Sequence, residues 1–257
     1  MFEWIKRLGK KARSLVLPER EERRSRNTEA IDLAPYTPEP KVFLGQLAYF
    51  ELSQFEILTN ELKYAPTTFD KAELSEAAAK SFQKYRAIAK ALSVQGFDAT
   101  DAMDPYTERI ETFHSRTNGI DWFEAVVKVY LVGGLLEDFY RRLAVGLPET
   151  IREDVEKALK DTTFERFAKT CLLEAMKDNP QLASRLALWG RRLMGDVLLE
   201  LRAAFDNRKL AGITKGRRLS LEEERRVNLA AYSKLEPLIS ELIGAHSMRM
   251  DAIGLAA

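Results

Sequence analysis

A carboxylate interrupts the apolar stripe of the segment that spans residues 42–62. The stripe advances at alternating steps of four and three residues through Leu44, Ala48, Glu51, Phe55, Leu58 and Leu62. This spacing is typical of one face of an α-helix that packs against other helices, so Glu51 points inward. A charged carboxylate in a low-dielectric interior is strongly destabilised unless it is paired or protonated. The side chain that faces Glu51 therefore constrains what the chain can fold into and do.

The rest of the chain repeats this helical pattern. Apolar residues at steps of three and four predict helices over residues 41–64, 70–96, 122–145, 149–177 and 181–206, and a last helix from Ser220. No segment alternates apolar and polar residues between turns, as a strand would. The 257 residues, 46% of them hydrophobic, are enough to bury a core of ordinary size. We therefore predict an all-α antiparallel four-helix bundle with additional C-terminal helices and a short N-terminal amphipathic helix.

Local signals predict where these helices begin, end and bend. Asp70, Asp121 and Ser220 are the expected N-cap residues, and Gly96 is the expected C-cap glycine. The helix over 149–177 is expected to bend near residues 161–163. In the helix over 122–145, the expected seam includes Leu136, Tyr140 and Leu143, and Asp138 is expected to form a local ion pair with Arg141.

Positive charge is concentrated at the N-terminus. Residues 1–26 contain nine Lys or Arg and four Glu, although the formal net charge of the whole chain is only +1. Residues 2–16 place apolar side chains on one helical face and basic ones on the other, as in segments that lie on an anionic membrane surface or dock on an acidic partner. The alternative is that this segment packs back on the bundle or forms a basic arm. Candidate contacts with an anionic surface are Trp4, Lys6, Arg7, Lys10, Lys11 and Arg13.

The distribution of charged and apolar residues divides the chain into two segments. We expect residues 1–40 to form the basic amphipathic segment and a linker, and residues 41–257 to form the helical domain. Basic residues interrupt the apolar residues of the N-terminus, and no run in the chain approaches the roughly 18–20 apolar residues that span a bilayer. The single Cys171 excludes an internal disulfide and is typical of a reducing compartment. We expect a cytoplasmic protein that can associate with the inner face of the membrane.

The four helices of the expected bundle form two similar pairs. Glu51 lies 30 residues before Ser81 in the first pair, and Gly133 lies 28 residues before Asp161 in the second. In ferritin-like di-iron bundles, two helices each provide one carboxylate and the other two each provide a carboxylate followed three residues later by a histidine. The spacing of this chain matches that arrangement, but its residues do not.

Several segments resemble a known family. They read LAYFEL (47–52), FHSRT (113–117), DWFEAVVKVY (121–130), DFYR (138–141), RLALWGRRLMG (185–195) and AHSMRMDAIGL (245–255). Through them the chain resembles, over about residues 43–255, the actinobacterial ferritin-like proteins that are named for their similarity to the tRNA isopentenyl-adenosine hydroxylase (MiaE-like). This resemblance implies a ferritin-like bundle, a di-iron cofactor and an oxygen-dependent hydroxylase.

The same resemblance implies six ligand positions, of which four are substituted here. The family pattern has Glu at Glu51, Glu and His at Ser81 and Lys84, Asp at Gly133, and an Asp-x-x-His motif that runs from Asp161 to Phe164. Serine, lysine, glycine and phenylalanine cannot supply the nitrogen and oxygen donors or the negative charge that two iron ions need. We therefore expect a degenerate site without metal or other cofactor, in which Lys84 forms a buried ion pair with Glu51 and Phe164 fills space.

Two hypotheses about function remain. The first is a non-catalytic ferritin-like scaffold, a pseudoenzyme that binds an acidic protein partner or a membrane surface through its basic segments. The second is a metal- and oxygen-dependent hydroxylase that acts on RNA or another substrate, as the family name implies. His114, His246 and Cys171 are interpreted as structural residues, because lone residues of these types on amphipathic helices are more often buried and hydrogen-bonded than catalytic.

Overall fold

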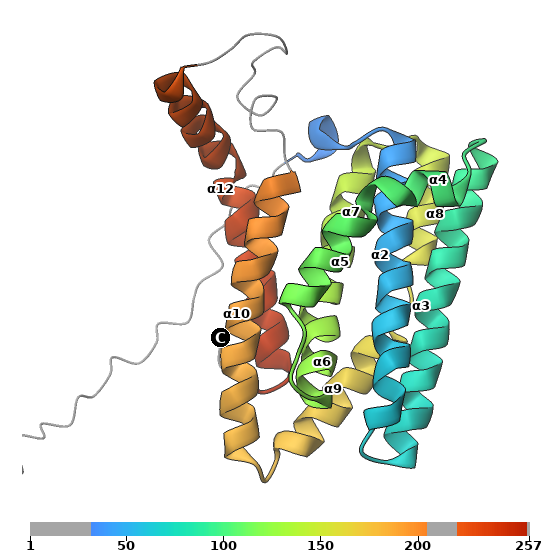
Figure 1. Cartoon of the computed structure of the whole chain (residues 1–257), viewed down its shortest axis with the longest axis vertical. Coiled ribbons are helices and arrows are strands. Elements are labelled where there is room, and N and C mark those ends of the chain that lie inside the picture. The colour runs from blue at the N-terminus through green and yellow to red at the C-terminus, as the bar shows by residue number, and fades with distance from the viewer. Residues whose placement is uncertain (1–31, 205–219, 256–257) are drawn as a thin grey trace, which may run out of the picture. The chain divides into compact units, whose positions relative to one another are not determined.

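The computed structural model describes residues 32–204 and 220–255 (Figure 1). Contacts divide the chain into the units Met1–Ala30 and Ile31–Ala257. The expected N-terminal amphipathic helix, with its candidate contacts from Trp4 to Arg13, lies outside the described residues. Leu33 is buried in the same core as the bundle helices. The helical unit therefore includes residues before the expected boundary at 40/41.

Four long helical stretches form the bundle. They are α2 (Pro40–Glu61), α3 (Thr68–Val94), α6 (Trp122–Lys128) with η4 (Val129–Gly133) and α7 (Gly134–Leu143), and α8 (Glu149–Ala158) with α9 (Thr163–Met176). The short helices α4 (Ala99–Met103), η3 (Asp104–Tyr106) and α5 (Thr107–Arg116) connect the first pair to the second. The described residues contain helices and no strands, which confirms the prediction of an all-α ferritin-like bundle.

Two further helices follow the bundle. α10 (Pro180–Ala204) and α12 (Leu221–Ala252) lie side by side and pack on the α6–α7 stretch (Figure 1). Trp189 of α10 donates a hydrogen bond from Nε1 to the carbonyl oxygen of Glu124 in α6, at 3.1 Å. Within the described ranges, no helix combines the length and the apolar character needed to cross a membrane.

Local sequence signals explain where most helices begin and end. Asp121 accepts a hydrogen bond from the backbone of Glu124 at the start of α6, as predicted, and Ser220 forms a capping box at the start of α12. The turn after α3 contains Gly96 in the left-handed region, with φ +78°. The start of α3 differs from the prediction, because Thr67 rather than Asp70 is the N-cap residue.

The third bundle helix contains a π-helical turn. Residues Val129–Gly133 form η4, a π-helix between α6 and α7. A π turn closes i to i+5 hydrogen bonds and so holds about one residue more than an α turn. Side chains after Gly133 are therefore rotated relative to the uniform α-helix that the sequence pattern assumed. The sequence predicted Leu136, Tyr140 and Leu143 on the bundle seam. Leu143 is buried, whereas Leu136 and Tyr140 are partly buried against the core and Leu135 and Phe139 are the other buried residues of α7.

Candidate functional site

Five of the six predicted ligand positions line one cavity. Its volume is about 110 Å³, and it lies between α3, the η4–α7 stretch and α9. The positions on its wall are Ser81, Lys84, Gly133, Asp161 and Phe164. The sixth, Glu51 on α2, is fully buried and interacts electrostatically with Lys84. The spacing of the two helix pairs therefore located residues that meet in space.

Lys84 pairs with a carboxylate that the sequence analysis did not identify. Its Nζ donates a hydrogen bond to Oε1 of Glu137 at 2.6 Å, and the two side chains are only 10% and 17% exposed. Arg141, one turn further along α7, binds the other oxygen of Glu137 at 3.2 Å. The expected ion pair between Lys84 and Glu51 is therefore wrong. Glu137 and Arg141 follow Gly133 by four and eight residues, so they lie on the same face of α7 as that position and reach the cavity.

Glu51 is buried without a hydrogen-bonding partner. Neither of its carboxylate oxygens contacts a donor among the described residues. Burial raises the pKa of Glu51 to about 8; the charge of Glu137 raises it too, while Lys84 and Arg141 lower it. Burial alone would lower the pKa of Lys84, but Glu51 and Glu137 outweigh it and raise that pKa. At neutral pH a protonated Glu51 therefore lies buried near the cavity, whose wall contains the pair of Lys84 and Glu137.

The three predicted ligand positions of the second helix pair are engaged in local contacts. Asp161 accepts hydrogen bonds from the backbone nitrogen and the hydroxyl of Thr163, at 3.0 and 3.2 Å, next to the start of α9. Phe164 packs against the core, with its ring 6.3 Å from that of Phe167. Gly133 has no side chain, and a Cβ there would lie 3.1 Å from Oε1 of Gln54. The substituted positions are thus filled by packing and local hydrogen bonds.

The donor set of this cavity does not fit a di-iron centre. Such a centre needs about four carboxylates and two histidines that are free to bind metal. Here an ammonium group occupies the cavity wall, and Glu137 is engaged by Lys84 and Arg141. The two histidines are used elsewhere: Nε2 of His114 lies 2.9 Å from Ser53 Oγ, and Nε2 of His246 donates to the carbonyl of Gly190 at 3.0 Å. In the described part of the chain, no three His, Cys, Asp or Glu side chains are placed to share a metal ion.

A second ion pair links the cavity to the C-terminal helix. Arg249 of α12 binds the carboxylate of Asp138 and donates to the carbonyl oxygen of Gly134 at 3.1 Å. Asp138 also accepts from Arg141 at 2.7 Å, the local pair that the sequence suggested. A Cβ on Gly134 would lie 2.7 Å from Nε of Arg249, so this glycine allows the arginine to approach the helix backbone. The sequence analysis did not predict that Arg249 lies at this site, because no local sequence pattern relates it to α7.

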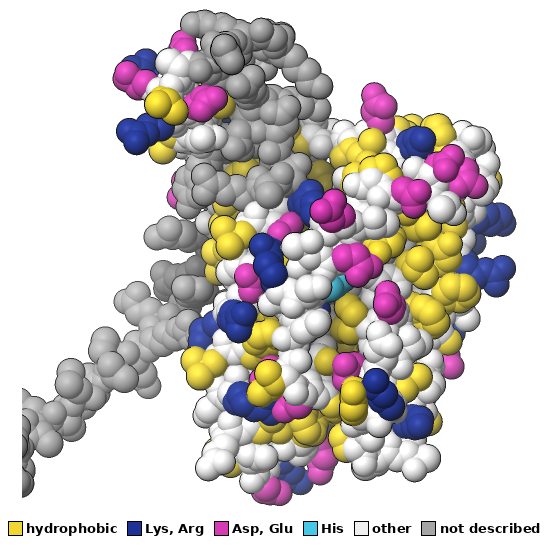
Figure 2. All heavy atoms as spheres, in the orientation of Figure 1, with side chains coloured by type: hydrophobic (Ala, Val, Ile, Leu, Met, Phe, Trp, Pro, Cys, Tyr) yellow, Lys and Arg dark blue, Asp and Glu magenta, His cyan; other side chains and the backbone are white. Residues whose placement is uncertain are grey.

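Charge on the described surface is mixed. On the face drawn in Figure 2, acidic and basic side chains are interspersed over the helices. That face therefore offers no broad region of one charge sign. The sequence-based expectation of an anion-binding surface rests on the N-terminal segment.

Comparisons with known proteins agree with this fold. No curated protein sequence matches the chain. A family model described as "Ferritin-like domain, actinomycetes" matches residues 36–216, which is more than half of the chain and includes all six positions discussed above. The chain therefore belongs to the actinomycete ferritin-like domain family.

Proposed function

We propose that this protein is a non-catalytic member of its family, a ferritin-like scaffold in which an ion pair replaces the metal centre. The observation that carries the proposal is the 2.6 Å contact between Lys84 and Glu137 in the cavity that contains the predicted ligand positions. A fixed ammonium group repels metal cations and supplies the positive charge that buried carboxylates require. The single positive charge of Lys84 is thus matched to the fewer carboxylates that remain at this site.

The scaffold engages an acidic partner or an anionic membrane surface through its basic N-terminal segment. Support for this part comes from the sequence, because residues 1–26 carry nine Lys or Arg against four Glu. Each basic residue near an anionic membrane surface contributes about 1 kcal/mol to binding, so a cluster of this size is sufficient for peripheral association. The apolar residues of the same segment add hydrophobic contacts.

We expect purified protein from metal-supplemented cells to contain less than one iron, manganese or zinc ion per chain. The measurement is elemental analysis after removal of loosely bound metal. A matched comparison is the variant in which Ser81→Glu, Lys84→His, Gly133→Asp and Phe164→His restore the family pattern, which should bind more metal than the wild type. Two tightly bound ions per wild-type chain would contradict the scaffold and favour the alternative, a MiaE-like hydroxylase.

Deletion of residues 1–26 should abolish binding to the anionic partner and leave the fold intact. We expect the melting temperature to stay nearly unchanged, because the bundle helices bury their own apolar faces from α2 onward. Co-sedimentation with vesicles that contain anionic lipid measures binding to a membrane, and neutral vesicles are the control. A fall in melting temperature of about 10 °C or more would show that the segment contributes several kcal/mol to the folded domain.

A further inference from the structure

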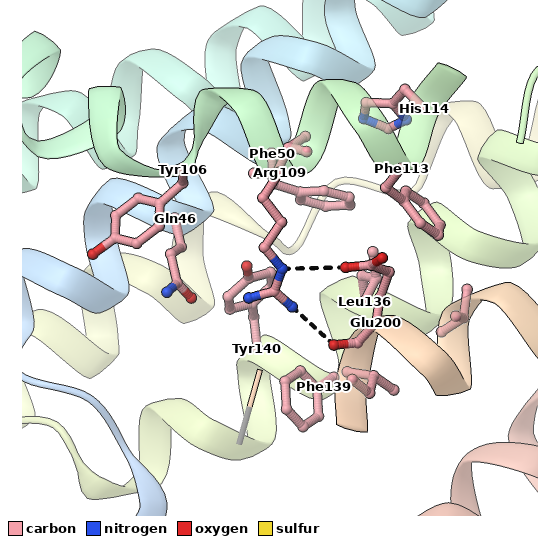
Figure 3. A pocket seen from close by; sticks show the side chains of 13 residues that line it. Gln46, Phe50, Tyr106, Arg109, Phe113, His114, Leu136, Phe139, Tyr140 and Glu200 are labelled. Atoms are coloured by element: carbon pink, nitrogen blue, oxygen red, sulfur yellow. Dashed lines mark hydrogen bonds and ion pairs between the residues drawn. The ribbon is translucent and has the colours of Figure 1, made fainter. Parts of the chain in front are cut away.

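A second cavity lies on the other side of the contact between α2 and α7. Its volume is about 100 Å³, and side chains of α2, α5, α7 and α10 line it (Figure 3). Phe50 and Tyr140 belong to this cavity, whereas their chain neighbours Glu51 and Arg141 belong to the Lys84 site. The two sites are therefore separate, and the argument for the second does not rest on the proposed function.

Five phenylalanine and tyrosine rings line this cavity. They belong to Phe50, Tyr106, Phe113, Phe139 and Tyr140. The ring of Tyr140 lies 5.9 Å from that of Phe50 at an interplanar angle of 40°, and 6.2 Å from that of Phe139 at 59°. Tilted rings at these separations present both edges and faces, which favours a planar aromatic ligand over an aliphatic one of the same size.

A fixed guanidinium group reaches into the cavity. Arg109 donates from Nε to the carboxylate of Glu200 at 3.1 Å and from Nη2 to the carbonyl oxygen of the same residue at 2.8 Å. Figure 3 shows this guanidinium between Tyr140 and Glu200, where the two interactions connect α5 to α10. A guanidinium held in this way can stack on an aromatic ring at little entropic cost.

The charges at this cavity favour a neutral ligand. Glu200 binds both Arg109 and Arg116, so its carboxylate is fully engaged. A cationic ligand would be repelled by the two arginines, and an anionic ligand by the carboxylate of Glu200. The hydroxyl of Tyr140 makes no hydrogen bond to the described residues, and burial raises its pKa above the ordinary value, so it stays protonated. It can therefore donate to or accept from a polar group of the ligand.

We propose that this cavity binds one uncharged, single-ring aromatic molecule with a hydrogen-bonding substituent, for which phenol is the simplest example. The ring lies among the five aromatic side chains and beneath the Arg109 guanidinium. Its substituent bonds the Tyr140 hydroxyl. The volume of about 100 Å³ is smaller than the roughly 150 Å³ of an engineered cavity that binds benzene, but this cavity is not closed, because its wall includes Arg109, whose side chain is 44% exposed.

The test is a titration of the full chain with phenol, toluene, cyclohexanol and benzoate, followed by ligand-observed NMR and thermal shift. For a ligand of seven heavy atoms we expect a Kd of about 1 mM for phenol. Toluene should bind about fivefold more weakly, because it lacks the hydrogen bond. Cyclohexanol and benzoate should bind more weakly still. No phenol binding up to about 10 mM would overturn the proposal, since that is ten times the expected Kd.

Variants locate the binding site. Tyr140→Phe should weaken phenol binding about fivefold and leave toluene binding unchanged, because only the hydroxyl is lost. Leu136→Trp fills the cavity and should abolish binding of both. Leu188→Trp, on an exposed part of α10, is the matched control and should bind phenol like the wild type. If Leu136→Trp does not fold, Tyr140→Phe alone tests the binding site. The assignment would be contradicted if this variant lost phenol and toluene binding equally, or if it kept both unchanged.

Discussion

Replacing Lys84 with methionine should lower the free energy of unfolding by about 3–5 kcal/mol. The substitution leaves Glu137 with Arg141 as its one remaining basic partner among the described residues. Removing one member of a buried ion pair is costly because the other charge stays in a low-dielectric environment. Chemical denaturation at pH 7 measures the loss. Lys80→Met is the matched control and should cost less than about 0.5 kcal/mol, since Lys80 forms an exposed pair with Glu76 on the same helix.

A double-mutant cycle identifies the partner of Lys84. Lys84→Met combined with Glu137→Gln should recover much of the stability that Lys84→Met loses, because no buried charge then lacks a partner. The combination with Glu51→Gln should recover less, because Glu51 is already protonated at neutral pH. Small and additive effects of Lys84→Met and Glu137→Gln would mean that the two side chains do not form the pair seen here.

Glu51→Gln should remove a dependence of the free energy of unfolding on pH that amounts to several kcal/mol. The pKa of Glu51 rises from 4.5 to about 8 on folding, so the folded state binds more protons than the unfolded chain between these values. Ionisation of Glu51 therefore lowers stability as pH rises from about 4.5 to about 8, by up to about 1.4 kcal/mol per pH unit. The free energy of unfolding of Glu51→Gln minus that of the wild type should therefore increase by about 3–5 kcal/mol from pH 5 to pH 8.5.

The measurement is the difference in unfolding free energy between the two proteins across this range. Taking the difference cancels other groups, including Lys128, whose pKa is lowered by burial to about 8. Glu76→Gln is the control, because it makes the same chemical change at a side chain of α3 that is 59% exposed. A flat difference for Glu51→Gln would show that Glu51 is ionised throughout and has a partner.

The helices could be predicted because their signals are local. The apolar steps of four and three recur in every bundle helix, and Asp121, Ser220 and Gly96 mark ends that the structure confirms. The bend expected near residues 161–163 is a complete break between α8 and α9, where Asp161 bonds Thr163. Thr67 was missed as a cap because Thr67 and Asp70 are both good N-cap residues, and the choice between them depends on tertiary packing.

The partners within the site could not be predicted in the same way. The spacing within the two helix pairs correctly predicted that Ser81, Lys84, Gly133 and Asp161 lie close together, because the two pairs have similar lengths. Which carboxylate Lys84 meets depends on rotation about the α7 axis, and a change of one residue in a single turn alters it. The presence of Glu137 four residues after Gly133 was the available signal, since residues at that spacing share a helix face.

The π turn also makes chain length a determinant of chemistry. Removing one residue from Val129–Gly133 would restore a regular helix and rotate everything after it by about 100° relative to α6. Tyr140 would then take the angular position of Phe139, and Phe139 that of Asp138, so the surroundings of both cavities would change with no substitution in α7. Two relatives with the same α7 sequence can therefore present different side chains to Lys84 if they differ by one residue before it. Alignments of this family that are read column by column will miss such differences unless insertions in this turn are tracked.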